Sequence, residues 1–127
     1  MPHLTIEYSA NLAGQVDMAA LCRATHAALM ASGLFEAGAP RVRAVVCDDY
    51  AIADLAPENA FVAMVLRMGP GRSAADRKAL GDRLMAAVAV VLAAPLATQN
   101  FALSLEIVEI DAAMSWKRNT MHARLRG

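Results

Sequence analysis

The chain repeats one order of predicted elements, and this repeat restricts its possible folds more than any other feature. A strand, a helix and a strand are predicted within residues 1–48 and again within residues 60–110, followed by a tail over residues 111–127. Each helix is long enough to connect two parallel strands of one sheet. Two folds of the mixed α/β (α+β) class have this order. They are the ferredoxin-like fold and a fold that pairs two β-α-β units about a pseudo-twofold axis.

The first half follows from its side-chain pattern. Residues 3–8 alternate between apolar and polar side chains, which predicts a strand with one buried face. Asp17 is suited to be an N-cap and Gly33 to end a helix, so we expect a helix over Met18–Ser32. A second strand is predicted over Arg41–Cys47.

The second half shows the same order. The apolar run within Ala60–Met68 predicts a strand, and a capping box at residues 73–76 opens a helix that we expect to end at about Ala94. Residues 101–110 form the fourth predicted strand. In the tail, we expect residues 114–122 to add a small edge strand.

Composition limits the classes of partner. A chain of 127 residues is expected to form a single domain. Its formal net charge is zero and its pI is about 6.8, so nothing predicts binding to nucleic acid or to an anionic membrane. Hydrophobic residues make up 57% of the chain, above the roughly 45–50% of ordinary domains. We therefore expect a homo-oligomer in which the excess covers subunit interfaces.

The cysteines and the N-terminal region suggest a cytoplasmic protein. Cys22 and Cys47 lie in apolar contexts without a C-x-x-C motif, so we expect reduced core cysteines and no zinc site. The N-terminal residues include His3 and Glu7 and do not resemble a secretory signal. The apolar stretch over residues 84–97 is too short to span a bilayer and is expected to be a buried helix.

Pro2 is a candidate general base. Within a chain, a proline nitrogen is an amide without basicity or an N–H. Removal of Met1 would convert the Pro2 nitrogen into a free secondary amine, and α-amino groups titrate near ~7.7–8.0. The proline ring would also fix the direction of the lone pair. A chain that retained Met1 would have no such base.

Three arginines are candidate anion-binding residues. Arg41 and Arg43 lie two residues apart on a predicted strand and therefore project from one face. Arg72 lies in the turn over residues 69–73, immediately before a helix, where backbone amides and a guanidinium together suit a carboxylate. Cations close to the Pro2 amine would lower its pKa and keep it neutral. Whether the three arginines converge on Pro2 depends on the fold.

Several short motifs together resemble a known family. They are Met1-Pro2-His3 at the start of a strand, Glu7, Arg41-Val42-Arg43, Ala53-Asp54, Gly69-Pro70-Gly71-Arg72-Ser73 and Lys117-Arg118-Asn119-x-x-His122-Ala123. In combination and spacing they are similar to the 5-carboxymethyl-2-hydroxymuconate isomerase family of the tautomerase superfamily. The resemblance covers nearly the whole chain. It implies two β-α-β units per subunit and a homotrimer in which the sheets enclose a central barrel.

The resemblance also implies a reaction and its residues. A processed Pro2 would move a proton on an unsaturated dicarboxylate or tricarboxylate, without metal or organic cofactor, in the catabolism of aromatic compounds. Arg72 and Arg41 would hold carboxylates and stabilise enolate charge. Arg43 is a further candidate cation for the substrate. Tyr50 and Trp116 are candidate aromatic residues of the pocket, although aromatic residues in small domains more often serve packing.

The sequence leaves other functions open. The chain would be a non-catalytic anion-binding or assembly module if Met1 blocked its N-terminus. It would also be an enzyme for another reaction of the superfamily, such as hydrolytic dehalogenation or decarboxylation. Those reactions use an N-terminal proline too, so Pro2 does not distinguish among them.

Overall fold

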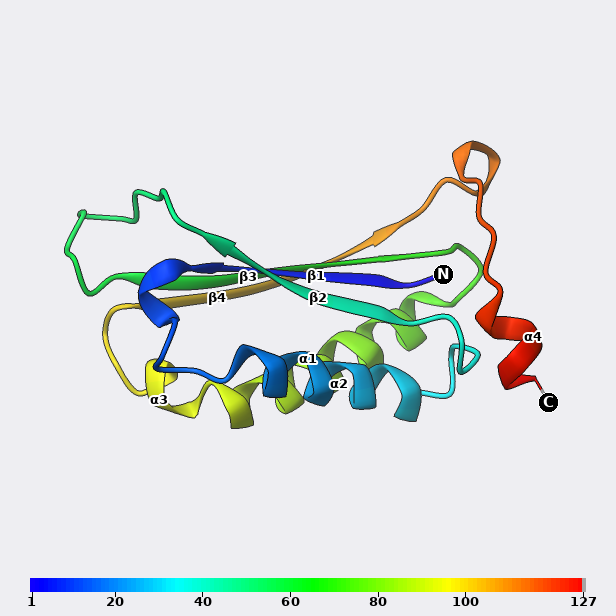
Figure 1. Ribbon diagram of the computed structural model, residues 1–127, viewed down its shortest axis with the longest axis horizontal. Helices are drawn as coiled ribbons and strands as arrows, with labels where there is room; N and C mark the ends of the chain where they lie inside the picture. Colours follow the sequence, from blue (N-terminus) through cyan, green and yellow to red (C-terminus); the bar gives the residue numbers. More distant parts are fainter. Residues whose placement is uncertain (127) are drawn as a thin grey trace.

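The protein forms one four-stranded sheet with its two long helices on the same face (Figure 1). This architecture is seen in a computed structural model that describes residues 1–126; Gly127, the last residue of the predicted tail, lies outside the described residues. The strands are β1 (His3–Ser9), β2 (Arg41–Cys47), β3 (Ala60–Met68) and β4 (Phe101–Glu109). The long helices are α1 (Met18–Ala31) and α2 (Ala74–Val91). The shorter helices are η1 (Ala10–Leu12), α3 (Ala93–Leu96), η2 (Ala112–Met114) and α4 (Met121–Leu125).

Strand pairing decides between the two folds that the sequence left open. The order in the sheet is β2-β1-β3-β4, with β1 parallel to β2, β3 parallel to β4, and β1 antiparallel to β3. Each half is therefore a β-α-β unit whose two strands are direct neighbours. In the ferredoxin-like fold another strand separates the parallel pair. The predicted pseudo-twofold arrangement is confirmed, with its axis between β1 and β3.

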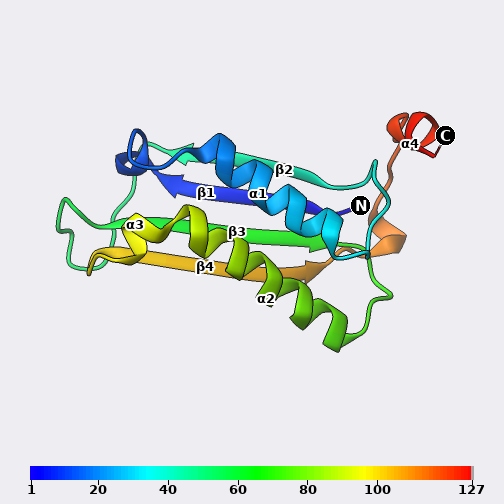
Figure 2. The same cartoon turned by 90° about the horizontal axis from the view of Figure 1, so that it is seen from below.

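The core lies between the sheet and the two helices. Helix α1 contacts β2, α2 contacts β4, and the helices contact each other (Figure 2). Alternate residues of the central strands β1 and β3 are buried against the helices. The fully buried side chains include Leu4, Ile6, Val62 and Leu66 from the sheet and Leu21, Leu29, Leu80 and Leu84 from the helices.

The predicted helix starts are confirmed by their caps. The Asp17 side chain accepts a hydrogen bond from the backbone N–H of Ala20, and the Ser73 hydroxyl accepts one from the backbone N–H of Asp76. These bonds satisfy N–H groups that have no partner within the first helical turn. Gly33 follows α1 with a φ of +73°, a conformation that glycine adopts without strain.

The second helix ends earlier than predicted. Helix α2 stops at Val91, and the separate short helix α3 follows, so the expected end at Ala94 is wrong by three residues. Pro95 explains the break, because proline has no N–H to offer the carbonyl of residue 91 and its ring clashes with that carbonyl.

The predicted edge strand at residues 114–122 is wrong. This segment contains no strand; it follows η2, crosses toward the loop before β2 and enters α4. Its Asn119 side chain donates a hydrogen bond to the Gly38 carbonyl at 2.7 Å, so the tail is attached to that loop by a side chain and not to β4 by a strand ladder.

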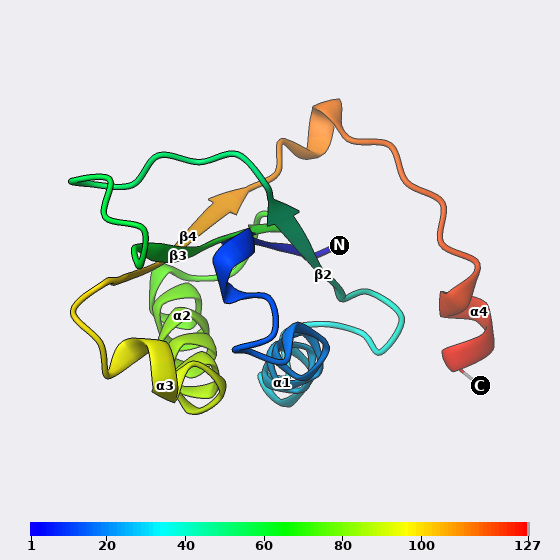
Figure 3. The same cartoon turned by 60° about the vertical axis from the view of Figure 1, so that its left-hand side comes forward.

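Neither of the two long helices covers the other face of the sheet (Figure 3). It exposes Val45, Val65 and Val108, which are 45%, 37% and 36% accessible. Apolar side chains on an open sheet face are a feature of surfaces that associate.

Candidate active site

The topology brings four separate segments to one end of the sheet. Because β1 runs parallel to β2, His3 pairs with Arg41, and because β1 runs antiparallel to β3, His3 also pairs with Arg67. The N-terminus, the loop before β2, the turn after β3 and the C-terminal tail therefore meet at this end (Figure 1). This is the arrangement that the sequence could not establish.

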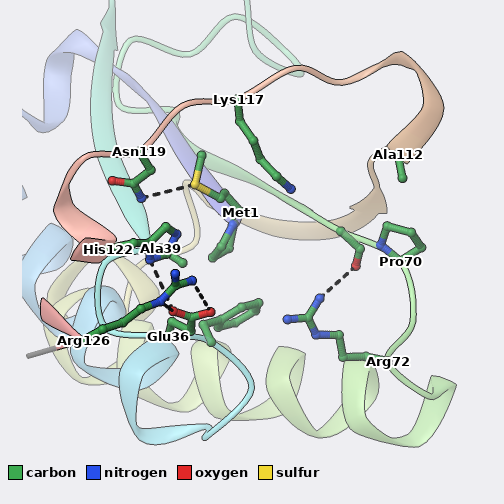
Figure 4. A pocket seen from close by; sticks show the side chains of 13 residues that line it. Met1, Glu36, Ala39, Pro70, Arg72, Ala112, Lys117, Asn119, His122 and Arg126 are labelled. Carbon is green, nitrogen blue, oxygen red and sulfur yellow. Dashed lines mark hydrogen bonds and ion pairs between the residues drawn. The ribbon is translucent and has the colours of Figure 1, made fainter.

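Two adjoining cavities lie among these segments. The larger, of about 550 Å³, is lined by Pro2 and Arg72 together with Met1 and Lys117 (Figure 4). The smaller, of about 290 Å³, is lined by Arg41 and again by Met1 and Lys117. The larger cavity has the size of a small-molecule site.

Pro2 is buried at the start of β1, where its carbonyl accepts a hydrogen bond from the Arg41 backbone N–H at 3.1 Å. Its nitrogen is here an amide, since Met1 precedes it. The burial holds the proline ring at the cavity wall and gives the nitrogen one defined position.

Arg72 is held in place by two loops. Its Nη2 donates to the Leu34 carbonyl at 2.8 Å, and its Nη1 donates to the Gly69 carbonyl at 3.4 Å. The guanidinium also lies over the Phe35 ring, 5.1 Å from the ring centre, in a cation–π contact. The side chain is therefore oriented before any ligand binds.

Arg41 and Arg43 occupy different places. Arg41 Nη1 donates to the Ala39 carbonyl at 2.9 Å and lies in the smaller cavity. Arg43 lines neither of these cavities; it lies on the exposed sheet face, where its Nη1 is 3.4 Å from His3 Nδ1. Burial, followed by the positive charges of Arg43 and Arg41, lowers the pKa of His3. A neutral His3 accepts the bond from Arg43.

The charges around the N-terminus favour a neutral amine. Partial burial is the largest factor that lowers the pKa of the Met1 amine, and the positive charges of Lys117, Arg72 and Arg41 lower that pKa further. Each of these effects disfavours the protonated form. Two of these cations, Arg72 and Lys117, line the cavity that Pro2 also lines.

The two aromatic candidates lie far from each other. Trp116 lines the smaller cavity, although its side chain is 85% exposed. Tyr50 follows the C-terminal end of β2, whereas the cavities lie beside the N-terminal end of that strand. The Tyr50 ring packs edge-on against Phe61 with 6.4 Å between ring centres. One chain therefore does not bring Tyr50 to these cavities.

The sequence interpretation gave no role in the pocket to several residues that lie at the site. Phe35 lies under Arg72, and Lys117 and Asn119 reach the cavities from the tail. The tail is attached by Arg126, which donates two hydrogen bonds to the Glu36 carboxylate at 2.7 and 2.9 Å (Figure 4). The basic tail motif was the available signal for Lys117 and Asn119, whereas nothing in the local sequence pointed to Phe35.

Within residues 1–126, no three His, Cys, Asp or Glu side chains lie together in a way that would hold a metal ion. The same residues form no helix that is long and apolar enough to cross a membrane. What the site does contain is a proline beside the N-terminus, in a cavity that Arg72 and Lys117 also line, and these cations suit an anionic ligand.

Solved structures have the same fold. A crystal structure of a 5-carboxymethyl-2-hydroxymuconate isomerase from Deinococcus radiodurans R1 superposes with a TM-score of 0.92 at 39% identity, covering 99% of this chain and 95% of that one. A fused 4-OT wild-type symmetric trimer superposes with a TM-score of 0.66 at 10% identity, covering 91% and 93% of the two chains, which is similarity of fold alone. The fold and the site define a member of the tautomerase superfamily.

Sequence comparison identifies the family within this class. The sequence model of the 5-carboxymethyl-2-hydroxymuconate isomerase family matches residues 2–125. The 5-carboxymethyl-2-hydroxymuconate Delta-isomerase of Escherichia coli is 32% identical over 123 residues, covering 97% of this chain and 98% of that protein. The chain belongs to the 5-carboxymethyl-2-hydroxymuconate isomerase family, which confirms the resemblance found in the sequence.

Proposed function

We propose that the chain, once Met1 is removed, isomerises 5-carboxymethyl-2-hydroxymuconate or a closely similar unsaturated dicarboxylate or tricarboxylate. The observation that carries the proposal is the position of Pro2, which is buried at the wall of a cavity that also contains Arg72. The two relatives reported above at 32% and 39% identity are both named as isomerases, which favours isomerisation over dehalogenation or decarboxylation.

Pro2 acts as the general base. Its neutral amine removes the proton of the substrate's enol hydroxyl, which leaves a dienolate. The protonated amine then returns the proton to carbon at the far end of the conjugated system. The product is the 2-oxo isomer with its remaining double bond shifted, and no electron or atom is lost. The conjugated carboxylate delocalises the charge, so the reaction as proposed uses no cofactor.

The cations bind the substrate and lower the barrier. Arg72, held by Leu34 and Gly69, binds one carboxylate and stabilises the charge of the dienolate. Arg41 binds the substrate in the adjoining cavity, and Trp116 contacts the substrate there. Arg43 and Tyr50 contribute only if an adjacent subunit brings them to the site.

We further propose a homotrimer assembled through the face of the sheet that neither long helix covers. The exposed Val45, Val65 and Val108 support it, as does the 57% hydrophobic composition. Light scattering at micromolar concentration should give three times the chain mass of 13.4 kDa. A monomeric mass would contradict the assembly without affecting the chemistry of Pro2.

We place the reaction in the cytoplasmic breakdown of aromatic compounds. The unpaired thiols of Cys22 and Cys47 agree with a reducing compartment. Localisation of a tagged chain by cell fractionation checks this, and a periplasmic protein would refute it.

The test of the function begins with the intact mass of the purified chain. A mass that lacks one methionine shows that the Pro2 amine is free to act as the base. The isomerisation is then followed by the ultraviolet absorbance of the dienol substrate. Pro2→Ala leaves a primary amine in place of the ring amine and should remove most activity while the circular dichroism spectrum stays unchanged. Full activity of this variant, or of a chain that retains Met1, would exclude Pro2 as the base. Carboxylate binding without turnover would instead favour an anion-binding module.

A further inference from the structure

The side chain of Met1 lies where two polar donors converge. Its thioether sulfur accepts hydrogen bonds from Arg41 Nη1 and from Asn119 Nδ2, both at 3.3 Å. Figure 4 shows Asn119 reaching the sulfur and Lys117 extending from the tail toward the cavity. A thioether is a weak acceptor, so this is a poor partner for a guanidinium and an amide.

Both donors are oriented by the same loop. Arg41 Nη1 carries two N–H groups, of which one meets the Ala39 carbonyl at 2.9 Å and the other meets the sulfur. Asn119 Nδ2 likewise divides its two N–H groups between the Gly38 carbonyl, at 2.7 Å, and the sulfur. The backbone carbonyls therefore aim the remaining N–H of each residue at one point. Such donors need little reorganisation to bind an oxygen placed there.

Lys117 adds a positive charge at the same place. It lines both cavities, as Met1 does, so the methionine side chain lies between the Arg72 region and the Arg41 region. The residues that line the smaller cavity include Arg41, Lys117 and Arg118 but no carboxylate. The net charge of the whole chain is zero, so this excess of positive charge is local.

The tail is packed closely enough to fix these residues. Gly38 is buried beneath it, and a Cβ at that position would lie 3.1 Å from His122 Nδ1 and 3.3 Å from the His122 backbone nitrogen. The paired hydrogen bonds between Arg126 and Glu36 attach the end of α4. Asn119 is thus placed by contacts on both sides of it.

We infer that two residues of the C-terminal tail, Asn119 and Lys117, complete with Arg41 the second carboxylate subsite, which lies at the position of the Met1 thioether. Removal of Met1 both frees the Pro2 amine and opens this subsite, so the inference rests on the proposed function. Arg72 lines one of the two adjoining cavities and Arg41 lines the other, so the two subsites select an elongated diene with a carboxylate at each end. The C-terminal tail is therefore a determinant of substrate specificity.

The test compares two ligands of equal length that do not react. Trans,trans-muconate has a carboxylate at each end of a six-carbon diene, and sorbate has one; neither has the enol hydroxyl. Calorimetry on the chain that lacks Met1 should show muconate binding about tenfold more tightly than sorbate, the effect of one additional charged hydrogen-bonded group. A chain released from an N-terminal fusion with Met1 retained should lose this preference. If the chain with Met1 preferred muconate over sorbate as strongly as the chain without it, the inference would be overturned.

Variants of the tail identify the residues. Lys117→Gln removes the charge, and Asn119→Asp removes the donor but keeps the oxygen that accepts from the Met121 N–H. Both should reduce the muconate preference to within about twofold of unity in the chain that lacks Met1. The matched control is Arg124→Gln, which removes one charge from an exposed position on α4 and should keep the preference. If Lys117→Gln and Asn119→Asp keep it as well, the tail does not form the subsite.

The ratio of the muconate affinity to the sorbate affinity distinguishes loss of the subsite from a general loss of binding or of activity. A variant that merely loosens the tail weakens both ligands together and leaves their ratio unchanged, which counts against the subsite. A chain with the full muconate preference but no isomerase activity would refute the proposed function and support the subsite. An active isomerase without the muconate preference would support the proposed function and refute the subsite.

Discussion

In the Arg72→Ala variant, the expected loss of catalytic activity is much larger than the expected loss of stability. This substitution therefore distinguishes a catalytic role of Arg72 from a structural one. A guanidinium has five N–H groups, and in the described structure Arg72 uses one for the Leu34 carbonyl and one for the Gly69 carbonyl. Three remain for a carboxylate. Loss of one donor that stabilises developing negative charge costs about 2.7–4 kcal/mol, or roughly a 100- to 1000-fold decrease in kcat/KM.

The expected loss of stability is much smaller. One hydrogen bond of 2.8 Å and a cation–π contact at a half-buried position together contribute about 1 kcal/mol. For a chain of this length that is a decrease in Tm of about 3–5 °C, compared at fixed protein concentration because an oligomer's Tm depends on concentration. Arg72→Lys keeps the charge but not the planar fork, so its kcat/KM should lie between those of the parent and Arg72→Ala.

The assay is the steady-state rate of loss of dienol absorbance, with Tm from circular dichroism on the same samples. Arg83→Ala is the matched control, since Arg83 is an exposed arginine of α2, the helix that Arg72 precedes. It should change neither quantity. If Arg72→Ala lowered Tm but left kcat/KM within about threefold of the parent, Arg72 would serve only to join the two loops.

Three further substitutions test the remaining site. Arg41→Ala should raise KM about tenfold with little change in kcat, because it removes binding common to the ground state and transition state; an effect on Tm alone would contradict this. Lys117→Gln removes one of the charges that, after burial, lower the pKa of the N-terminal amine, so that pKa should rise. Catalysis needs the neutral amine, hence the acid limb of the kcat/KM profile should move to higher pH, and an unmoved limb would show that Lys117 does not act on the base. Gly38→Ala places a Cβ against His122, so Tm and muconate affinity should both fall, whereas unchanged values would mean that the tail adjusts freely.

Local structure was largely predictable because its signals are local. The limits of β2 and β3 and the caps at Asp17 and Ser73 all agree with the sequence prediction. The errors have identifiable causes. Pro95 ends α2 three residues early, and the tail forms side-chain bonds to the loop before β2 where a strand was expected. The low helix propensity of Pro95 was a local signal for the first error, whereas the bond at Gly38 joins residues far apart in the sequence and no propensity indicates it.

The candidate site was predictable only in part. Pro2, Arg41 and Arg72 were named from their chemistry and from a family resemblance that the comparisons confirm. The roles of these residues remain predictions for the substitutions above. Lys117 belonged to a motif but had no assigned role. Phe35 belonged to no motif, because its role depends on the Arg72 guanidinium that the fold places over its ring.

The sequence by itself determined which segments are strands and helices, since period-two and capping patterns depend on neighbours a few residues apart. It also determined the family, because the motifs keep their spacing over residues 2–125. Only the tertiary structure decided that residues 2, 41, 72 and 117 meet. Their meeting follows from the parallel pairing of β1 with β2 and the antiparallel pairing of β1 with β3, which bring Arg41 and the turn after β3 beside the start of β1. The bond between Asn119 and Gly38 attaches the tail at the same end. Packing between the two halves sets the pairing of β1 with β3, and no local pattern of side chains records it.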